Sequence, residues 1–199
     1  MTILGVVLAG GRARRFGGDK AFAELGGRPL IAHAIDTLAA QVDTVIINTN
    51  REDGRFATFG LPVVGDPLPG DHGPLNGVLA GLTFAATSTP VPDWLITLPV
   101  DTVAVPGDFV DRLTSAAEKA GAPSAYATAE DGGHYLCAAF RAGLKDSLSD
   151  WLNNPPGLKV DGFLNHVGAV PVSFANAPGT LPAFFNINSP DDLARAGRI

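Results

Sequence analysis

A strand that opens into a glycine-rich, basic loop is the feature that most restricts how this chain can fold. Residues 3–8 are an apolar run with β-branched side chains, which predicts a buried strand. The loop that follows, residues 9–20, holds four glycines, three arginines and a lysine. Glycine lets the backbone turn tightly and expose its N–H groups, and the basic side chains add positive charge. Together they predict a seat for a polyphosphate at the end of a strand.

Two common phosphate-binding loops are excluded by the spacing. The Walker A motif needs Gly-Lys followed by Ser or Thr, whereas Lys20 follows Asp19 and precedes Ala21. The Gly-x-Gly-x-x-Gly fingerprint of dinucleotide-binding proteins is also absent from the loop. The loop therefore belongs to another class of phosphate-binding site.

The first half of the chain alternates between strands and helices. Hydrophobic periodicity predicts strands at 3–8, 43–48, 62–66 and 94–98, with helices at 30–41 and 74–86. This alternation predicts an α/β fold with a mostly parallel sheet and helices on its faces. Ligands of such sheets bind beyond the carboxyl ends of the strands.

The second half is less regular. Strands at 124–129 and 134–140 are predicted to form a hairpin, and a further strand is expected at 170–174. Helices are expected at 106–120, 144–152 and 158–167, and a short one at 193–198 after a cap at Ser189 and Pro190. No repeat or linker interrupts the chain, so residues 1–199 are expected to form a single domain.

Several polar residues directly follow predicted strands. These are Asn48, Asp66 and Asp101, and together with the loop 9–20 they should meet at one edge of the sheet. Asp101 follows an apolar strand and Pro99, where a carboxylate must face a ligand, a cation or water. Mg²⁺ needs few protein carboxylates beside phosphate oxygens and water, so Asp101 is the candidate metal ligand.

Composition excludes several classes of protein. A net charge of −6 and a pI near 5.0 argue against a nucleic-acid binder, which needs a basic face. The apolar N-terminal run is too short for a signal peptide or a membrane span. The one cysteine, Cys137, is expected to be a buried structural thiol and cannot form an internal disulfide. We therefore expect a cytoplasmic protein that binds no membrane.

The segment from Leu8 to Lys20 resembles the signature of nucleotidyltransferases with a glycosyltransferase-A-like fold, and most resembles the molybdenum-cofactor guanylyltransferase family. The later motifs Asn48-Thr-Asn-Arg51, Gly73-Pro-Leu-Asn-Gly77 and Pro99-Val-Asp101 also match that family in order. The resemblance implies a three-layer α/β/α sandwich, Rossmann-like and of the nucleotide-diphospho-sugar transferase type.

The resemblance also implies a reaction: GMP is transferred from GTP to molybdopterin, pyrophosphate leaves, and Mg²⁺ assists. Lys20 and Arg15 would hold phosphate, and Asp101 would hold the metal. On the protein side it implies molybdoenzymes, their chaperones or cofactor-biosynthesis proteins as partners. The nucleotide-site residues that it implies are Leu8, Ala9, Gly10, Gly11, Lys20, Asn48, Asp66, Gly73, Pro74, Asp101, Asn186 and Asn188.

The sequence departs from the family pattern at a few positions. Val100 replaces the usual Cys or Ala, and no proline follows His134, where the family has one, so the assignment of His134 or Arg141 to the acceptor stays open. Asn186 and Asn188 could instead cap the last helix. Arg12 and Arg14 are expected to be solvated, and His33 and His166 to be partly exposed.

Three hypotheses of function remain: the guanylyltransferase described above and two alternatives. A sister nucleotidyltransferase would use CTP or another acceptor, as molybdopterin cytidylyltransferases and sugar-phosphate enzymes do. A non-catalytic relic of the fold would be free to lose Lys20 or Asp101, and this chain keeps both. The N-x-N-R and G-P-L-x-G motifs favour the guanylyl reading.

Overall fold

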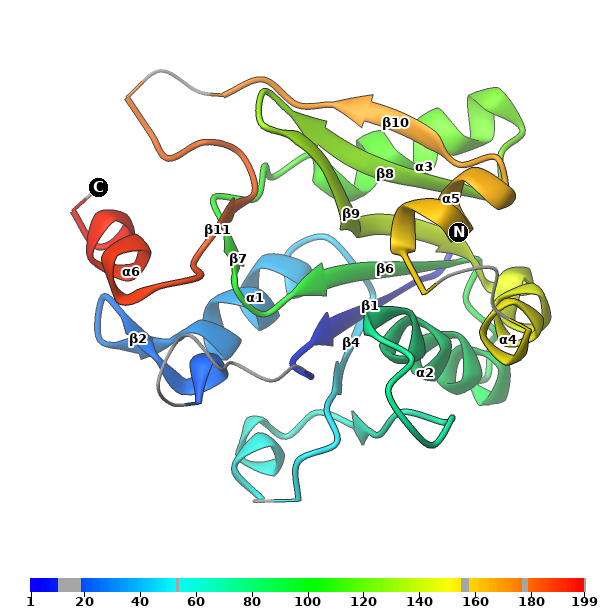
Figure 1. Cartoon of the computed structure of the whole chain (residues 1–199), viewed down its shortest axis with the longest axis horizontal. Helices are drawn as coiled ribbons and strands as arrows, with labels where there is room; N and C mark the ends of the chain where they lie inside the picture. Colours follow the sequence, from blue (N-terminus) through cyan, green and yellow to red (C-terminus); the bar gives the residue numbers. More distant parts are fainter. Residues whose placement is uncertain (11–18, 53, 155–157, 177–178, 199) are drawn as a thin grey trace.

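A seven-stranded, mostly parallel sheet runs through the centre of the protein (Figure 1). The structure is a computed structural model that describes residues 1–10, 19–52, 54–154, 158–176 and 179–198. The strands lie in the order β10-β8-β9-β6-β1-β4-β5. Their bounds are β1 Ile3–Leu8, β4 Thr44–Asn48, β5 Val63–Val64, β6 Trp94–Pro99, β8 Ser124–Ala129, β9 Gly132–Arg141 and β10 Val170–Ser173.

The central strand β1 pairs in parallel with β4 and β6, and β9 is the strand that runs antiparallel to its neighbours. Ala129 pairs with Gly132, so only Glu130 and Asp131 connect β8 to β9. A two-residue connection can join only antiparallel strands, which explains the reversal of β9. The predicted mostly parallel sheet and hairpin are confirmed.

Helices cover both faces of the sheet and make three layers. On one face α1 (Leu30–Ala39) and α3 (Phe109–Ala120) pack against Val7 and Ile96; on the other α2 (Pro74–Thr87), α4 (Lys145–Asn153) and α5 (Val160–His166) pack against Val6 and Leu95. Successive strand residues point to opposite faces, so a sheet between two helical layers needs apolar residues at every position. All six residues of β1 are buried, which explains its uninterrupted apolar sequence.

Two helices begin at other residues than expected. α3 begins at Phe109, three residues later than expected, because residues 106–109 form a turn in which Phe109 N–H donates to the carbonyl of Pro106. α6 (Pro190–Ala196) begins three residues earlier than 193, directly after the expected cap at Ser189. Ser189 and Asp192 form a capping box there, which supplies acceptors for the free N–H groups of the first turn.

A two-stranded ribbon attaches the C-terminal segment to the end of β6. β7 (Thr102–Val103) pairs antiparallel with β11 (Phe185–Asn186), and Figure 1 shows this ribbon beyond the arrowhead of β6. A second ribbon, β2 (Glu24–Leu25) with β3 (Arg28–Pro29), leads into α1. Among the described residues, every helix is too short or too polar to cross a bilayer.

Candidate active site

The carboxyl ends of three central strands lie at one level. Leu8, the last residue of β1, pairs with Asn48 of β4 on one side and with Pro99 of β6 on the other. The backbone continues this register, because Ala9 N–H donates to the carbonyl of Asn48, and Val100 N–H to that of Leu8. The loops that follow these strands therefore leave the sheet along the same edge. Gly11 and Arg15, like Arg12 and Arg14, lie outside the described residues.

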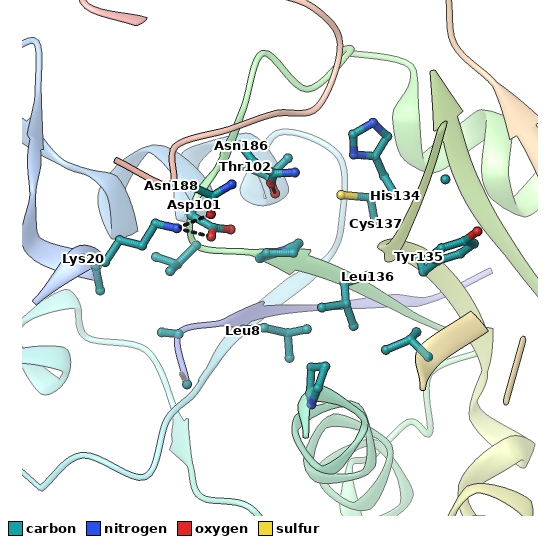
Figure 2. A pocket seen from close by; sticks show the side chains of 18 of the residues that line it. Leu8, Lys20, Asp101, Thr102, His134, Tyr135, Leu136, Cys137, Asn186 and Asn188 are labelled. Atoms are coloured by element: carbon teal, nitrogen blue, oxygen red, sulfur yellow. Dashed lines mark hydrogen bonds and ion pairs between the residues drawn. The ribbon is translucent and has the colours of Figure 1, made fainter. Parts of the chain in front are cut away.

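Lys20 and Asp101 form an ion pair at this edge. Lys20 Nζ donates to Asp101 Oδ2 over 2.5 Å and to Asn188 Oδ1 over 3.0 Å, as Figure 2 shows. The side chains of Lys20 and Asp101 are 15% and 24% exposed, so both remain within reach of a ligand. Three segments that are far apart in the sequence thus bring a cation, a carboxylate and an amide oxygen together.

The C-terminal segment brings Asn188 to this group, two residues after Asn186 of β11. Thr102 Oγ1 donates to Asn186 Oδ1 over 2.9 Å, and Ile187 N–H donates to the carbonyl of Asp101 over 2.9 Å. The carboxylate of Asp192 accepts from the N–H of Asn188, over 2.9 Å. The Ser189 hydroxyl and then the Asn188 N–H lower the pKa of Asp192, because they stabilise its charged form. Asn188 therefore serves both the start of α6 and the Lys20 group.

A second polar group follows β4 and β5. Asn48 Nδ2 donates to Asp66 Oδ1 over 2.9 Å, and Asn50 Nδ2 donates to Asp66 Oδ2 over 2.8 Å. Asn50 Oδ1 in turn accepts from the N–H of Asp66 over 2.7 Å. Asn48 is buried at 3% exposure, so its amide fixes the carboxylate and leaves Asp66 the better placed of the two to meet a ligand.

Two adjacent cavities open along the strand ends. The first, about 710 Å³ and called the lysine cavity below, is lined by Lys20, Asp101, Asn186 and Asn188, together with residues 133–137 and 158–161. The second, about 720 Å³ and called the asparagine cavity, is lined by Asn48, Asp66, residues 70–74 and Gly77. The two cavities are neighbours, because four residues line both of them: Leu8, Gly10, Arg51 and Pro74.

Asp19 connects the loop before Lys20 to the segment after β4. Its carboxylate forms ion pairs with Arg51, at 2.5 Å, and with Arg55. Asp19 and Arg51 both line the lysine cavity. Asp19 was not predicted as a site residue from the sequence, although its position directly before Lys20 could have indicated one.

The expected buried thiol is confirmed. Of the three histidines below, His134 lines the lysine cavity, whereas His33 and His166 do not. Cys137 is 2% exposed, and burial raises the pKa of its thiol well above the usual range. His134 lines the lysine cavity, where it hydrogen-bonds Asp131 at 2.9 Å. His33 is hydrogen-bonded to the carbonyl of Leu25, a partner that the sequence did not reveal. His166 packs against Trp151.

Arg141 lies far from the strand ends that form the site. It pairs with Trp94, the first residue of β6, and its guanidinium stacks over that indole ring at 4.1 Å. It also donates to Glu118 over 3.3 Å. Because β9 is antiparallel to β6, its last residue lies at the amino end of β6, which removes Arg141 from the acceptor candidates.

A close contact explains the glycine at position 77. A Cβ atom there would lie 2.3 Å from Asn48 Oδ1 and 3.0 Å from Leu8 Cδ2. Gly77 belongs to α2, so alanine would gain helix propensity of up to about 1 kcal/mol. We expect the clash to win, because Asn48 is buried and hydrogen-bonded: Gly77→Ala should lower the free energy of unfolding by about 1–3 kcal/mol and weaken nucleotide binding.

Chemical denaturation and nucleotide titration measure these two effects. Gly143→Ala is the matched control, because a Cβ atom at Gly143 would meet nothing within 4 Å. A Gly77→Ala protein as stable as the parent, with unchanged nucleotide affinity, would show that Asn48 has no fixed position.

The donor set around Asp101 suits a hard cation. Within the described part of the chain, no group of three or more His, Cys, Asp or Glu side chains is placed to hold a metal ion. Mg²⁺ keeps several waters and takes one or two carboxylates together with substrate phosphates, so an all-protein cage is not required. Asp101 with the amide oxygen of Asn188 close by therefore fits a Mg²⁺ site completed by a bound nucleotide.

Comparisons with known proteins agree with this fold. Among solved structures, molybdopterin-guanine dinucleotide biosynthesis protein A from Archaeoglobus fulgidus superposes with a TM-score of 0.77 at 22% identity, covering 99% of this chain and 97% of that one. A CMP:2-keto-3-deoxy-manno-octonic acid synthetase complexed with CTP superposes with a TM-score of 0.73 at 14% identity, covering 100% and 98%. At these identities the likeness shows the three-layer nucleotidyltransferase fold.

Similarity of sequence identifies the family. The chain is 43% identical to the molybdenum cofactor guanylyltransferase of Cereibacter sphaeroides, over 98% of this chain and 96% of the relative. It is 42% identical to the protein of the same name from Rhodopseudomonas palustris (strain BisB5), over 98% and 92%. A family model described as the MobA-like NTP transferase domain matches residues 5–166. The chain therefore belongs to the MobA-like NTP transferases, and is a nucleotidyltransferase of the molybdenum cofactor guanylyltransferase family.

Proposed function

We propose that the protein transfers GMP from GTP to molybdopterin, which forms molybdopterin guanine dinucleotide and releases pyrophosphate. The observation that carries this proposal is the Lys20–Asp101–Asn188 group, which lines a cavity large enough for a second substrate. The adjacent asparagine cavity would take the nucleoside. The names of the relatives in Cereibacter and Rhodopseudomonas support the choice of guanine and molybdopterin.

The nucleoside would lie against Asp66. An ionised carboxylate accepts hydrogen bonds, so it suits the ribose hydroxyls or the N1–H and N2–H groups of guanine. Asn48 and Asn50 hold both of its oxygens in place before a ligand arrives. Gly73 and Pro74, at the start of α2, line the same cavity. The φ of Gly73 is +65°, a conformation that is unfavourable for residues with a side chain.

The triphosphate would extend from there along Leu8, Ala9 and Gly10 to Lys20. Lys20 would neutralise charge on the phosphates and on the departing pyrophosphate, together with the proposed clamp Arg15. Asp101 would hold Mg²⁺, with the amide oxygens of Asn186 and Asn188 close by. When bound, the ion would lower the negative charge of the phosphate oxygens in the transition state.

The chemical step needs no strong base. An oxygen of the terminal phosphate of molybdopterin would attack the α-phosphorus of GTP; the new O–P bond forms as the bond to the β-phosphate oxygen breaks. The attacking phosphate is already anionic at neutral pH, so no proton has to be removed. Lys20 then faces the charge that develops on pyrophosphate. We place the reaction in the cytoplasm, which a single cysteine, unable to form an internal disulfide, supports.

A panel of nucleotides tests this function. The protein is incubated with Mg²⁺, molybdopterin and GTP, CTP, ATP or UTP in turn, and pyrophosphate is measured. We expect release with GTP, because the guanylyl family motifs line the asparagine cavity. Omitting molybdopterin is the control and should abolish release. Release with CTP instead of GTP would identify a cytidylyltransferase; release with a sugar phosphate in place of the pterin would change the acceptor; no release with any would indicate a non-catalytic relic.

A further inference from the structure

Strand β9 bulges out of the sheet beside the lysine cavity. His134 pairs with Ala127 of β8, and the next pair is Ala138 with Tyr126, so three residues of β9 have no partner on β8: Tyr135, Leu136 and Cys137. All three line the lysine cavity. Bulges often turn side chains toward active sites. This bulge thus directs consecutive side chains of one strand at the cavity.

A buried hydroxyl holds the bulge. Thr97 of β6 is fully buried, and its Oγ1 donates to the carbonyl of Leu136 over 2.6 Å. This hydrogen bond replaces the ladder contact that the bulge interrupts, since β6 pairs with β9 only from Trp94 to Thr97. The backbone around Tyr135 is therefore tied to the central sheet and not left to solvent.

The ring of Tyr135 is held on one side and open on the other. It packs against Tyr126, with ring centroids 5.2 Å apart. It also lies over the backbone of Gly133, where a Cβ atom would come within 2.6 Å of the ring. Even so the residue is 38% exposed. A supported, exposed ring in a cavity is a ready surface for another flat ring.

The position of Tyr135 matches the far end of an elongated second substrate. In Figure 2, Lys20 and Asp101 lie at one end of the cavity and Tyr135 at the other, with Leu136 between them. Leu158, 39% exposed, lines the same cavity. Five large apolar side chains are strongly exposed among the described residues, and two of them meet here. Exposed apolar groups gathered in a cavity indicate a ligand site.

We infer that Tyr135 is the stacking platform for the pterin ring of the acceptor, and so a residue that determines acceptor specificity. This inference rests on the proposed function. The acceptor must place its phosphate near Lys20 and Asp101, where the α-phosphorus of GTP would lie. Its ring system then extends along Leu136 toward Tyr135. Flat heterocycles stack on aromatic side chains, and Leu158 adds an apolar contact.

Kinetics with each substrate varied separately test the platform. Tyr135→Ala should raise the KM for molybdopterin by about tenfold or more and leave the KM for GTP unchanged, because stacking acts on the acceptor alone. Tyr135→Phe keeps the ring and should behave like the parent; Tyr135→Leu keeps apolar area without a ring and should behave like Tyr135→Ala. Binding of molybdopterin without GTP, followed by quenching of pterin fluorescence, should give the same order.

A double-mutant cycle separates a ring contact from a general defect. Gly133→Ala should displace the Tyr135 ring and raise the KM for molybdopterin, but should have no further effect when Tyr135 is already alanine. Equal effects in both backgrounds would contradict the inference. So would an unchanged KM for molybdopterin in Tyr135→Ala, a raised KM for GTP, or a Tyr135→Phe protein as impaired as Tyr135→Ala.

Failure of the proposed function gives a different result. In that case the parent protein itself releases no pyrophosphate from GTP and molybdopterin. If the parent is active and the Tyr135 variants do not differ from it, the proposed function stands and the platform does not.

Discussion

Replacing Asp101 with asparagine is expected to reduce GMP transfer by about a hundredfold to a thousandfold, and replacing it with alanine to reduce transfer further. Asparagine offers a neutral oxygen at the same place, so it would hold Mg²⁺ more weakly than a carboxylate does. The Asp101→Asn protein should therefore need more Mg²⁺ for half-maximal activity, whereas the Asp101→Ala protein should not recover at any Mg²⁺ concentration. Pyrophosphate release at graded Mg²⁺ measures both effects.

The Asp101 variants must remain folded for a loss of activity to be assigned to metal binding. The Lys20–Asp101 pair is partly exposed, so its loss should change the free energy of unfolding by no more than about 1 kcal/mol. Asp36→Asn is the matched control: it also breaks an ion pair, to Arg28, but on an exposed part of α1 away from both cavities. Full transfer activity in Asp101→Asn would refute the assignment of Asp101 as metal ligand.

Replacing Lys20 with methionine is expected to weaken GTP binding by about tenfold to a hundredfold, because charge-assisted hydrogen bonds to phosphate are lost while the aliphatic stem is kept. Turnover should fall in addition, since the same charge faces the leaving pyrophosphate. The loss should depend on the phosphate chain. Titrations with GTP, GDP and GMP should show a large effect on GTP and a small one on GMP.

Two variants make the Lys20 result specific. Lys20→Arg keeps a positive charge but changes its shape, so it should retain part of the GTP affinity and less of the turnover. Lys145→Met removes an exposed lysine that pairs with Asp146 in α4, and should bind every nucleotide as the parent does. Equal weakening of GTP and GMP binding in Lys20→Met would place the side chain against the nucleoside and not the phosphates.

Much of the fold was predictable because the signals are local. An uninterrupted apolar run at 3–8 and an almost uniformly apolar one at 94–98 indicated buried strands, and the structure places both between two helical layers. The turn residues 130–133 indicated the hairpin, and Ser189 with Pro190 indicated the cap of α6. Boundaries were less accurate, as α3 and α6 show, because helix ends depend on local hydrogen bonds that the apolar periodicity does not determine. The single-domain organisation stays a prediction.

The candidate site was likewise predictable only in part. Motif order in the sequence determined which residue types follow each strand, and so pointed to Lys20, Asn48, Asp66 and Asp101. What these residues do to one another depends on contacts between segments that are far apart in the chain. Only the tertiary structure brings Asn188 within 3.0 Å of Lys20, and shows that the amides of Asn48 and Asn50 hold Asp66.

The proposed acceptor side of the site depends on tertiary structure alone. From the sequence, His134 and Arg141 at the two ends of one predicted strand were equal candidates. Because β9 is antiparallel to β6, Arg141 lies at the amino end of β6, away from the site. The sequence of residues 135–137 does not predict a bulge. The bulge depends on the register between β9 and β8 and on the hydroxyl of Thr97 in a third strand, β6. The sequence by itself determined that a glycine-rich, basic loop and a carboxylate follow the strands, from which we predict a phosphate-binding site. The pairing of strands determined which side chains face them across the cavity.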